Sequence, residues 1–279
     1  MATSAAAALR WLIGSELARY REEARLSLNE ASARTGMGKA KLHHLESGRQ
    51  AQDPDDITTL LSAYAVPAKD IDRLTTLTGR ADEATWWAPW AQVVPDWLKT
   101  YVGLEGLAES LFTFEALVIP GLLQTQEYAA AMTASAKSLR PDHGERFVKF
   151  RMARTRRLTD SERPLSFHAV IPEGALRLAV GTPDVRRDQL QHLLSMADLP
   201  TVTVQVVRPE DGPHSALGGG FVTLDFGSAA RPVVYIELKD GAVYLQEETQ
   251  VDAYTMVAND LRQVAMSPGQ SRELIASML

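Results

Sequence analysis

The sequence contains no cysteine among its 279 residues. This absence excludes disulfide bonds, thiol nucleophiles, iron–sulfur clusters and zinc sites built from cysteine. No apolar run reaches the roughly 18–20 residues that cross a bilayer, and the Ala-rich start of the chain has no basic segment ahead of an apolar core, as a signal peptide has. We therefore expect a cytoplasmic protein without a membrane partner.

An excess of positive charge is also missing. The net charge of −6, with 29 basic and 35 acidic residues, excludes a globally basic, histone-like DNA binder. Residues 9–50 nevertheless carry a net charge of +3, and the rest of the chain carries −9. This asymmetry predicts an anion-binding N-terminal module joined to an acidic body.

Residues 1–80 are predicted to form an all-α domain of five short helices. Ser27 followed by Glu30 is a capping box that starts the second helix. The fourth helix begins after Asp53, and the fifth follows Pro67. The first helix is defined by one apolar stripe at helical spacing, formed by Leu12, Ile13, Leu17 and Tyr20.

The stretch from residue 28 to 46 has the pattern of a helix-turn-helix. Such a motif needs a small residue in its first helix, a glycine in the turn and an apolar anchor in its second helix. Ser32, Gly36 and Leu42 supply these at spacings of four and six residues. The predicted DNA-binding residues lie on or beside the second helix, which reads base edges in this motif: Ser27, Lys39, Ala40, Lys41, His43, His44 and Arg49.

Several residues in this stretch carry a family resemblance: Leu26 to Glu30, Thr35 to Met37, Leu42, and Leu45 to Arg49. They resemble the xenobiotic-response-element (lambda-repressor-like) helix-turn-helix domain, which implies binding to a double-stranded DNA operator. The sequence departs from the family pattern where Ala31 replaces the usual Leu, Ser32 the usual Ala and Gly38 the usual Ser or Thr cap.

The rest of the chain resembles the effector-like domain of WhiJ-type actinobacterial regulators. The matching residues include 119–125 (Ile-Pro-Gly-Leu-Leu-Gln-Thr), Tyr128, Glu173, 175–177 and 234–237. The resemblance implies a cytoplasmic transcriptional regulator, in an antitoxin-like arrangement with a small acidic protein encoded nearby.

Residues 81–99 form a connector rich in Trp and Pro between the two domains. Trp86, Trp87 and Trp90 lie in it. One interpretation is a partner or ligand site. The other is that large aromatic side chains are buried there and lock the two domains together.

Residues 100–279 are predicted to form an α+β domain with a mixed sheet, used for dimerisation and for binding an effector or partner. Helices are expected over residues 103–117, 125–136, 142–159, 183–196, 247–264 and 268–278. Strands are expected over residues 165–171, 201–207, 221–226, 233–238 and 242–245. The helix between the first two strands predicts that they are parallel, and short connections predict an antiparallel meander for the last three.

Two polar groups in this domain are candidate partner or ligand residues. Glu173 and Arg177 follow a predicted strand, either as an acid and a cation in a cleft or as a local i,i+4 pair. Arg151 and Arg154 lie on a basic helix that either binds a partner, ligand or DNA or is a solvated face. No catalytic, metal or cofactor motif is present.

These patterns together predict a homodimeric, sequence-specific DNA-binding transcriptional regulator whose C-terminal domain senses a ligand or a small partner protein. One alternative is an antitoxin-like interaction protein that neutralises a small partner and binds DNA secondarily. An enzyme is the other alternative, and we expect no catalytic activity.

Overall fold

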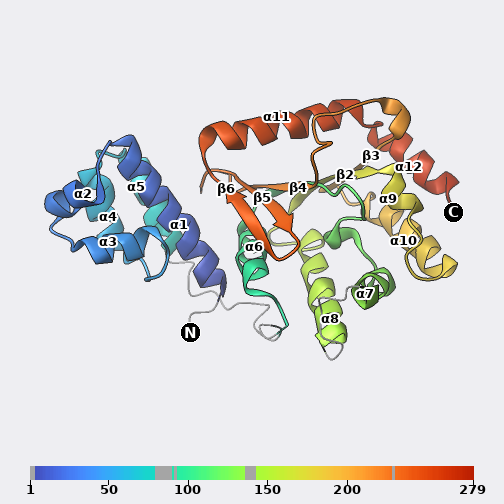
Figure 1. Cartoon of the computed structure of the whole chain (residues 1–279), viewed down its shortest axis with the longest axis horizontal. Coiled ribbons are helices and arrows are strands. Elements are labelled where there is room, and N and C mark those ends of the chain that lie inside the picture. Colours follow the sequence, from blue (N-terminus) through green and yellow to red (C-terminus); the bar gives the residue numbers. More distant parts are fainter. Residues whose placement is uncertain (1–3, 79–89, 91–92, 136–142, 228–229) are drawn as a thin grey trace. The chain divides into compact units, whose positions relative to one another are not determined.

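The computed structural model describes residues 4–78, 90, 93–135, 143–227 and 230–279 (Figure 1). The chain divides into two compact units. The first contains the N-terminal helices together with residues 95–108 and 225–231, and the second contains most of the remaining chain. No helix in the described part is both long and apolar enough to span a membrane.

The N-terminal helices of the first unit confirm the predicted all-α region. They are α1 (Ser4–Glu23), α2 (Leu28–Thr35), α3 (Lys39–Glu46), α4 (Pro54–Ala63) and α5 (Ala68–Thr78). Asp53 caps α4 by accepting a hydrogen bond from the backbone N–H of Asp55. Ile13 and Leu17 of α1 share one buried apolar core with Leu42 of α3, so α1 packs against the buried side of α3.

The first unit also contains helix α6 (Asp96–Leu107), which packs against α1. Leu107 at its end contacts the same apolar core. Residues 225–231 belong to this unit as well, and Arg231 Nη2 lies 3.3 Å from Glu23 Oε1 at the end of α1. Segments far along the sequence thus complete the N-terminal helical unit.

The second unit is built on a mixed sheet, which confirms the predicted α+β class. Its strands are β1 (Ser110–Phe114), β2 (Ser166–Pro172), β3 (Val202–Val207), β4 (Phe221–Asp225), β5 (Val233–Leu238) and β6 (Gly241–Leu245), in the order β3-β2-β1-β4-β5-β6. β2 and β3 are parallel and are joined through α10 (Pro183–Met196), as predicted. β4, β5 and β6 form the predicted antiparallel meander.

Strand β1 corrects the helix predicted over residues 103–117. The helix ends at Leu107, where Ala108 turns into extended backbone, and the chain continues as a strand parallel to β2. Phe112, Thr113 and Phe114 are aromatic or β-branched residues that favour a strand. β1 lies inside the sheet and all but its first residue are buried, so it lacks the alternation that would have marked it.

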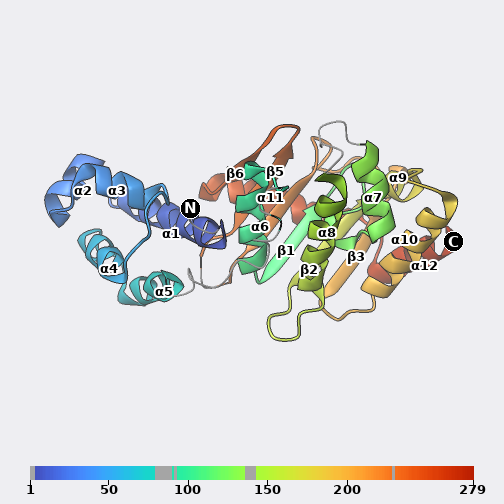
Figure 2. The ribbon, with the colours of Figure 1, turned by 90° about the horizontal axis from the view of Figure 1, so that it is seen from below.

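Helices cover both faces of this sheet. α11 (Glu248–Val264) lies on one face, and α7 (Gln126–Ser135), α8 (Gly144–Thr155) and α10 lie on the other (Figures 1 and 2). Phe112, Phe114 and Val234 share an apolar cluster with Val251 and Leu261 of α11. Their neighbours in sequence therefore point toward the face that carries α8.

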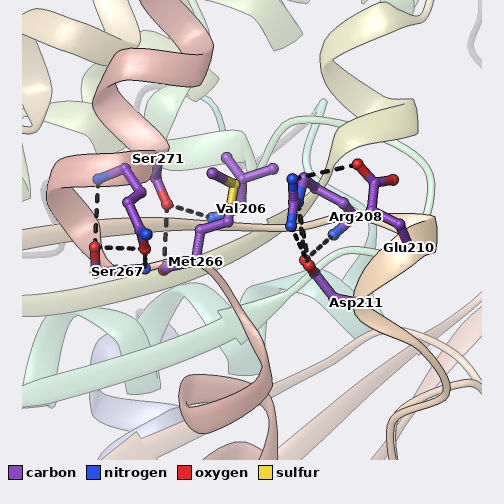
Figure 3. Close-up of polar contacts among 8 residues, drawn as sticks. Val206, Arg208, Glu210, Asp211, Met266, Ser267 and Ser271 are labelled. Carbon is purple, nitrogen blue, oxygen red and sulfur yellow. Dashed lines mark hydrogen bonds and ion pairs between the residues drawn. The ribbon is translucent and has the colours of Figure 1, made fainter.

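The outer edge of β3 is sealed by the chain leading into α12 (Pro268–Ser277), as Figure 3 shows. Met266 donates its backbone N–H to Val206 O at 2.9 Å, and Val206 donates its own N–H to Ser271 Oγ at 2.9 Å. Beyond the strand, Arg208 forms an ion pair with Asp211 at 2.6 Å. The two bonds at Val206 satisfy backbone groups that an edge strand otherwise leaves open.

Candidate nucleic-acid interface

The turn between α2 and α3 has the geometry that a helix-turn-helix requires. Gly36 adopts the left-handed conformation with φ of 71°, and its N–H bonds to Ser32 O at 3.0 Å. The Ser32 hydroxyl donates to Met37 O at 2.6 Å. Ser32 therefore provides both the small side chain that the sequence pattern needs and a hydrogen bond that ties α2 to the turn that leads into α3.

Helix α3 has one buried face and one exposed face. Leu42 and Leu45 are fully buried in the core of the first unit. The side chains predicted to read DNA lie on the other face, and these residues are exposed: Lys39, Ala40, His43, His44 and, after the helix, Arg49. A basic and partly aromatic surface is thus presented on a helix whose position is set by apolar contacts.

The other two predicted DNA-binding residues have partners within the unit. Lys41 Nζ lies 2.7 Å from Asp56 Oδ1 of α4. The hydroxyl of Ser27 accepts from the Glu30 N–H at 3.3 Å, and Glu30 Oε2 accepts from the Ser27 N–H at 2.8 Å, which completes the capping box; the Ser27 hydroxyl also donates to Glu30 Oε2 at 2.7 Å. The two hydrogen bonds that its carboxylate accepts from the Ser27 hydroxyl and the Ser27 N–H lower the pKa of Glu30.

Two glycines let α3 approach α1 closely. A Cβ atom added at Gly14 would lie 2.4 Å from Glu46 O and 2.7 Å from Leu45 O. One added at Gly48 would lie 2.8 Å from the backbone N of Trp11. The end of α3 is therefore held against α1 at a distance that side chains at these two positions would prevent.

Polar contacts fix the same end of α3. Arg21 binds Glu46 through two parallel hydrogen bonds of 2.7 and 2.9 Å, and both side chains are mostly buried. The carboxylate raises the pKa of Arg21. Gln52 donates to Arg10 O at 2.9 Å and to Leu45 O at 2.8 Å. These residues were not predicted from the sequence, although Gly14, a glycine inside a helix, was an available signal of close packing.

The candidate site residues of the second unit are dispersed. Glu173 and Arg177 form the short helix α9 (Glu173–Arg177) and pair with each other, with Arg177 Nε 2.8 Å from Glu173 Oε1. Trp86 and Trp87 lie outside the described residues. Trp90 is partly buried, with its ring centroid 6.4 Å from that of Phe150.

Helix α8 carries basic residues on two different surfaces. Three basic residues are exposed, as a solvated face requires: Arg146 and Lys149 in the helix, and Arg156 just after it. Arg151 and Arg154 are mostly buried, and Arg154 is only 9% exposed. The solvated-face interpretation is therefore wrong for these two arginines.

Two family models match the chain. Residues 12–74 match a model described as a helix-turn-helix domain, and residues 98–277 match a model described as a domain of unknown function (DUF5753). Neither the curated proteins nor the solved structures contain a match to this chain.

Proposed function

The chain belongs to the family defined by this domain of unknown function (DUF5753), whose model spans well over half of it, and from that premise we propose that the protein is a sequence-specific DNA-binding transcriptional regulator. The helix-turn-helix domain that precedes the family domain points to DNA binding. The observation that carries the proposal is the exposed basic face of α3, set opposite the buried Leu42 and Leu45.

The side chains of this face suit different parts of a DNA duplex. In this proposal Lys39 and His44 donate to base edges in the major groove, and Ala40 offers a methyl contact. Arg49, after the helix, is suited to a phosphate. Lys41 is also assigned to a phosphate. That phosphate would compete with Asp56 for the ammonium group of Lys41. His43 is exposed beside these residues and belongs to the same face.

We further propose that the protein acts as a homodimer. A two-fold dimer places its recognition helices about one helical turn of DNA, roughly 10 bp, apart or a multiple of that distance. The second unit would contribute the dimer contact and respond to a ligand or a small partner protein. In this proposal it regulates DNA binding and does not catalyse a reaction, since Glu173 and Arg177, the acid and cation considered for a cleft, bind each other.

Genome-wide mapping of bound DNA, followed by mobility shift on the sites found, tests the proposal. Lys39→Ala and His44→Ala should each cost about 1–3 kcal/mol on the operator and relax the preference at one base pair. Arg49→Ala and Lys41→Ala should weaken binding to operator and scrambled duplex alike, and lower the salt slope by about 1 each.

Lys69→Ala is the matched control, because it removes one exposed positive charge from α5 of the same unit. It should leave the preference for the operator over scrambled duplex intact. If all four variants of the α3 region bind the operator as the unchanged protein does, α3 does not read DNA. A monomer in sedimentation that binds one unrepeated site would refute the dimer.

A further inference from the structure

The helices α1 to α4 of the first unit all end in the same backbone conformation. The value of φ is 56° at Arg25 after α1, 71° at Gly36 after α2, 67° at Gly48 after α3 and 59° at Ala65 after α4. Glycine is the usual residue at such a helix end, because a Cβ atom in the left-handed conformation crowds the following carbonyl oxygen. Arg25 and Ala65 are the only non-glycine residues with a positive φ in the described part of the chain.

Arg25 and Ala65 occupy equivalent positions at their helix ends. The N–H of Arg25 bonds to Glu22 O at 2.8 Å, and the N–H of Ala65 bonds to Ser62 O at 3.1 Å. In each case the next N–H bonds to the carbonyl five residues before it, at 3.1 Å after α1 and 3.0 Å after α4. Both helices therefore end in a Schellman motif, and both residues are exposed. Ala65 is thus a matched reference for the backbone strain at Arg25.

The side chain of Arg25 does not offset this strain within the folded unit. Its guanidinium forms no hydrogen bond or ion pair with the residues that the structure describes. The two acids nearest before it are engaged by other arginines: Glu22 lies 3.3 Å from Arg21 Nη2, and Glu23 lies 2.7 Å from Arg19 Nη1. Strained backbone that the surrounding structure maintains without a local gain is characteristic of functional sites.

The corner that contains Arg25 is tied to the end of α3. Arg21 Nη1 donates to Leu26 O at 2.9 Å, and Nε and Nη2 of the same side chain bind Glu46, the last residue of α3. Leu26, the residue after Arg25, is buried in the apolar core of the unit. One guanidinium thus spans from this corner to the end of α3, and exposed Arg49 follows that end by three residues.

We propose that Arg25 holds a backbone phosphate of the bound DNA duplex. Helix α2 begins three residues after Arg25, and the first helix of a helix-turn-helix crosses the DNA backbone while the second lies in the major groove. A guanidinium suits a phosphate because two of its N–H groups donate in parallel. The proposal rests on the DNA binding proposed for α3 and adds a contact from outside that helix, which positions the unit on DNA without reading sequence.

This role predicts that stability and DNA binding change in opposite directions at Arg25. Arg25→Gly removes the strain and the positive charge together, so the variant should be more stable and bind DNA more weakly. Ala65→Gly removes the same strain without a change of charge, so it should be more stable and bind DNA equally well. Arg25→Lys keeps both the strain and the charge. A residue with a structural role alone would lower stability and binding together when it is replaced.

Thermal denaturation of the full-length protein measures the first effect. Arg25→Gly and Ala65→Gly should each raise the Tm by about 1–4 °C, because each relieves one residue of left-handed strain. Arg25→Lys should leave the Tm unchanged. Because the informative variant is expected to gain stability, a loss of DNA binding in it is not explained by unfolding.

Fluorescence anisotropy with a labelled operator duplex and a scrambled duplex measures the second effect, at several salt concentrations. Arg25→Gly should bind both duplexes about five- to tenfold more weakly at 0.1 M salt, and the difference should vanish toward 1 M. The slope of log K against log salt should fall by about 1. Ala65→Gly should bind as the unchanged protein does, and Arg25→Lys should keep the salt slope.

Three results would overturn the proposal. Arg25→Gly binds both duplexes as Ala65→Gly does, as expected if the side chain meets an acidic protein in place of DNA. The loss of affinity is confined to the operator, which would make the contact one to a base. Arg25→Gly lowers the Tm while Ala65→Gly raises it, which would assign Arg25 a structural role.

Failure of the proposed function gives a different pattern from failure of this contact. If the unchanged protein binds neither duplex, both proposals are wrong. If it binds DNA and Arg25→Gly binds equally well, only the contact at Arg25 is wrong. If Arg25→Gly weakens binding to both duplexes while the variants of the α3 region have no effect, the contact at Arg25 is supported and the reading of DNA by α3 is wrong.

Discussion

Replacing Gly14 by Ala should separate the recognition helix from its support. The added Cβ would lie 2.4 Å from Glu46 O and 2.7 Å from Leu45 O, whereas ordinary contacts begin near 3.4 Å. Both obstacles are backbone atoms, which cannot rotate away as a side chain can. The end of α3 must therefore move from α1 by about 1 Å, and this movement also stretches the two hydrogen bonds between Arg21 and Glu46.

Two effects of opposite sign determine the size of the change. Overpacking a well-packed interior costs about 1–3 kcal/mol. Ala in place of Gly inside a helix returns about 1 kcal/mol. Since the obstacles are rigid and an ion pair is stretched, we expect the upper part of the first range, and a net loss of about 2 kcal/mol in the free energy of unfolding.

Urea denaturation of the full-length protein measures this loss, and mobility shift measures the accompanying loss of operator affinity. Gly38→Ser is the control, because a Cβ at Gly38 meets nothing within 4 Å, and Ser would add a side-chain cap to α3 worth a few tenths of a kcal/mol. If Gly14→Ala is as stable as the unchanged protein and binds the operator equally well, the packing cost is absent, and the close approach of α1 and α3 is refuted.

Three further predictions follow from contacts outside the proposed base-reading face. Glu46→Gln should lower the free energy of unfolding by about 1–3 kcal/mol, because it leaves the mostly buried Arg21 without its counter-charge. Glu145→Gln is the control and should cause no measurable loss, because the pair of Glu145 with Lys149 is exposed. Equal losses in the two variants would contradict this prediction. Ser271→Ala removes the acceptor of the Val206 N–H and should lower the free energy of unfolding by about 1–3 kcal/mol. The specific readout is faster hydrogen exchange at the Val206 amide. An unchanged exchange rate would show that other contacts protect the edge of β3. Burial and the nearby Glu237 raise the pKa of Glu115 from 4.5 to about 7 in the folded protein, so the free energy of unfolding should fall as pH rises from 4.5 to 7. Glu115→Gln should remove that fall and be more stable than the unchanged protein at pH 8, by at most about 3 kcal/mol. Denaturation curves measured at pH 4.5 and pH 8 test both expectations.

Local signals predicted most of the helices and the strands with clear connections. Ser27, Glu30 and Asp53 marked helix starts that depend on neighbouring residues alone. The βαβ unit around α10 followed from its length and position between two apolar runs. β1 was missed because Leu104, Leu107 and Leu111 continue a helical spacing across the point where the chain becomes extended.

The candidate sites were predicted less completely, because their decisive contacts join residues far apart in sequence. The exposed positions of α3 followed from the placement of Leu42 and Leu45. The pairing of Lys41 with Asp56 depends on how α3 meets α4. The proximity of Glu115 to Arg151 depends on the sheet and on the helix that covers it, and neither spacing nor composition reveals it.

The DNA-binding unit is not made from one continuous piece of chain. Helix α6 covers α1, and Arg231, more than two hundred residues after α1, reaches Glu23 at its end. A fragment that ends at residue 80 would keep the apolar core of α1–α5 but would leave uncovered the side of α1 against which α6 packs. The compact unit is therefore complete only in a chain that runs past residue 231, and a fragment cut at the end of α5 lacks two of its segments.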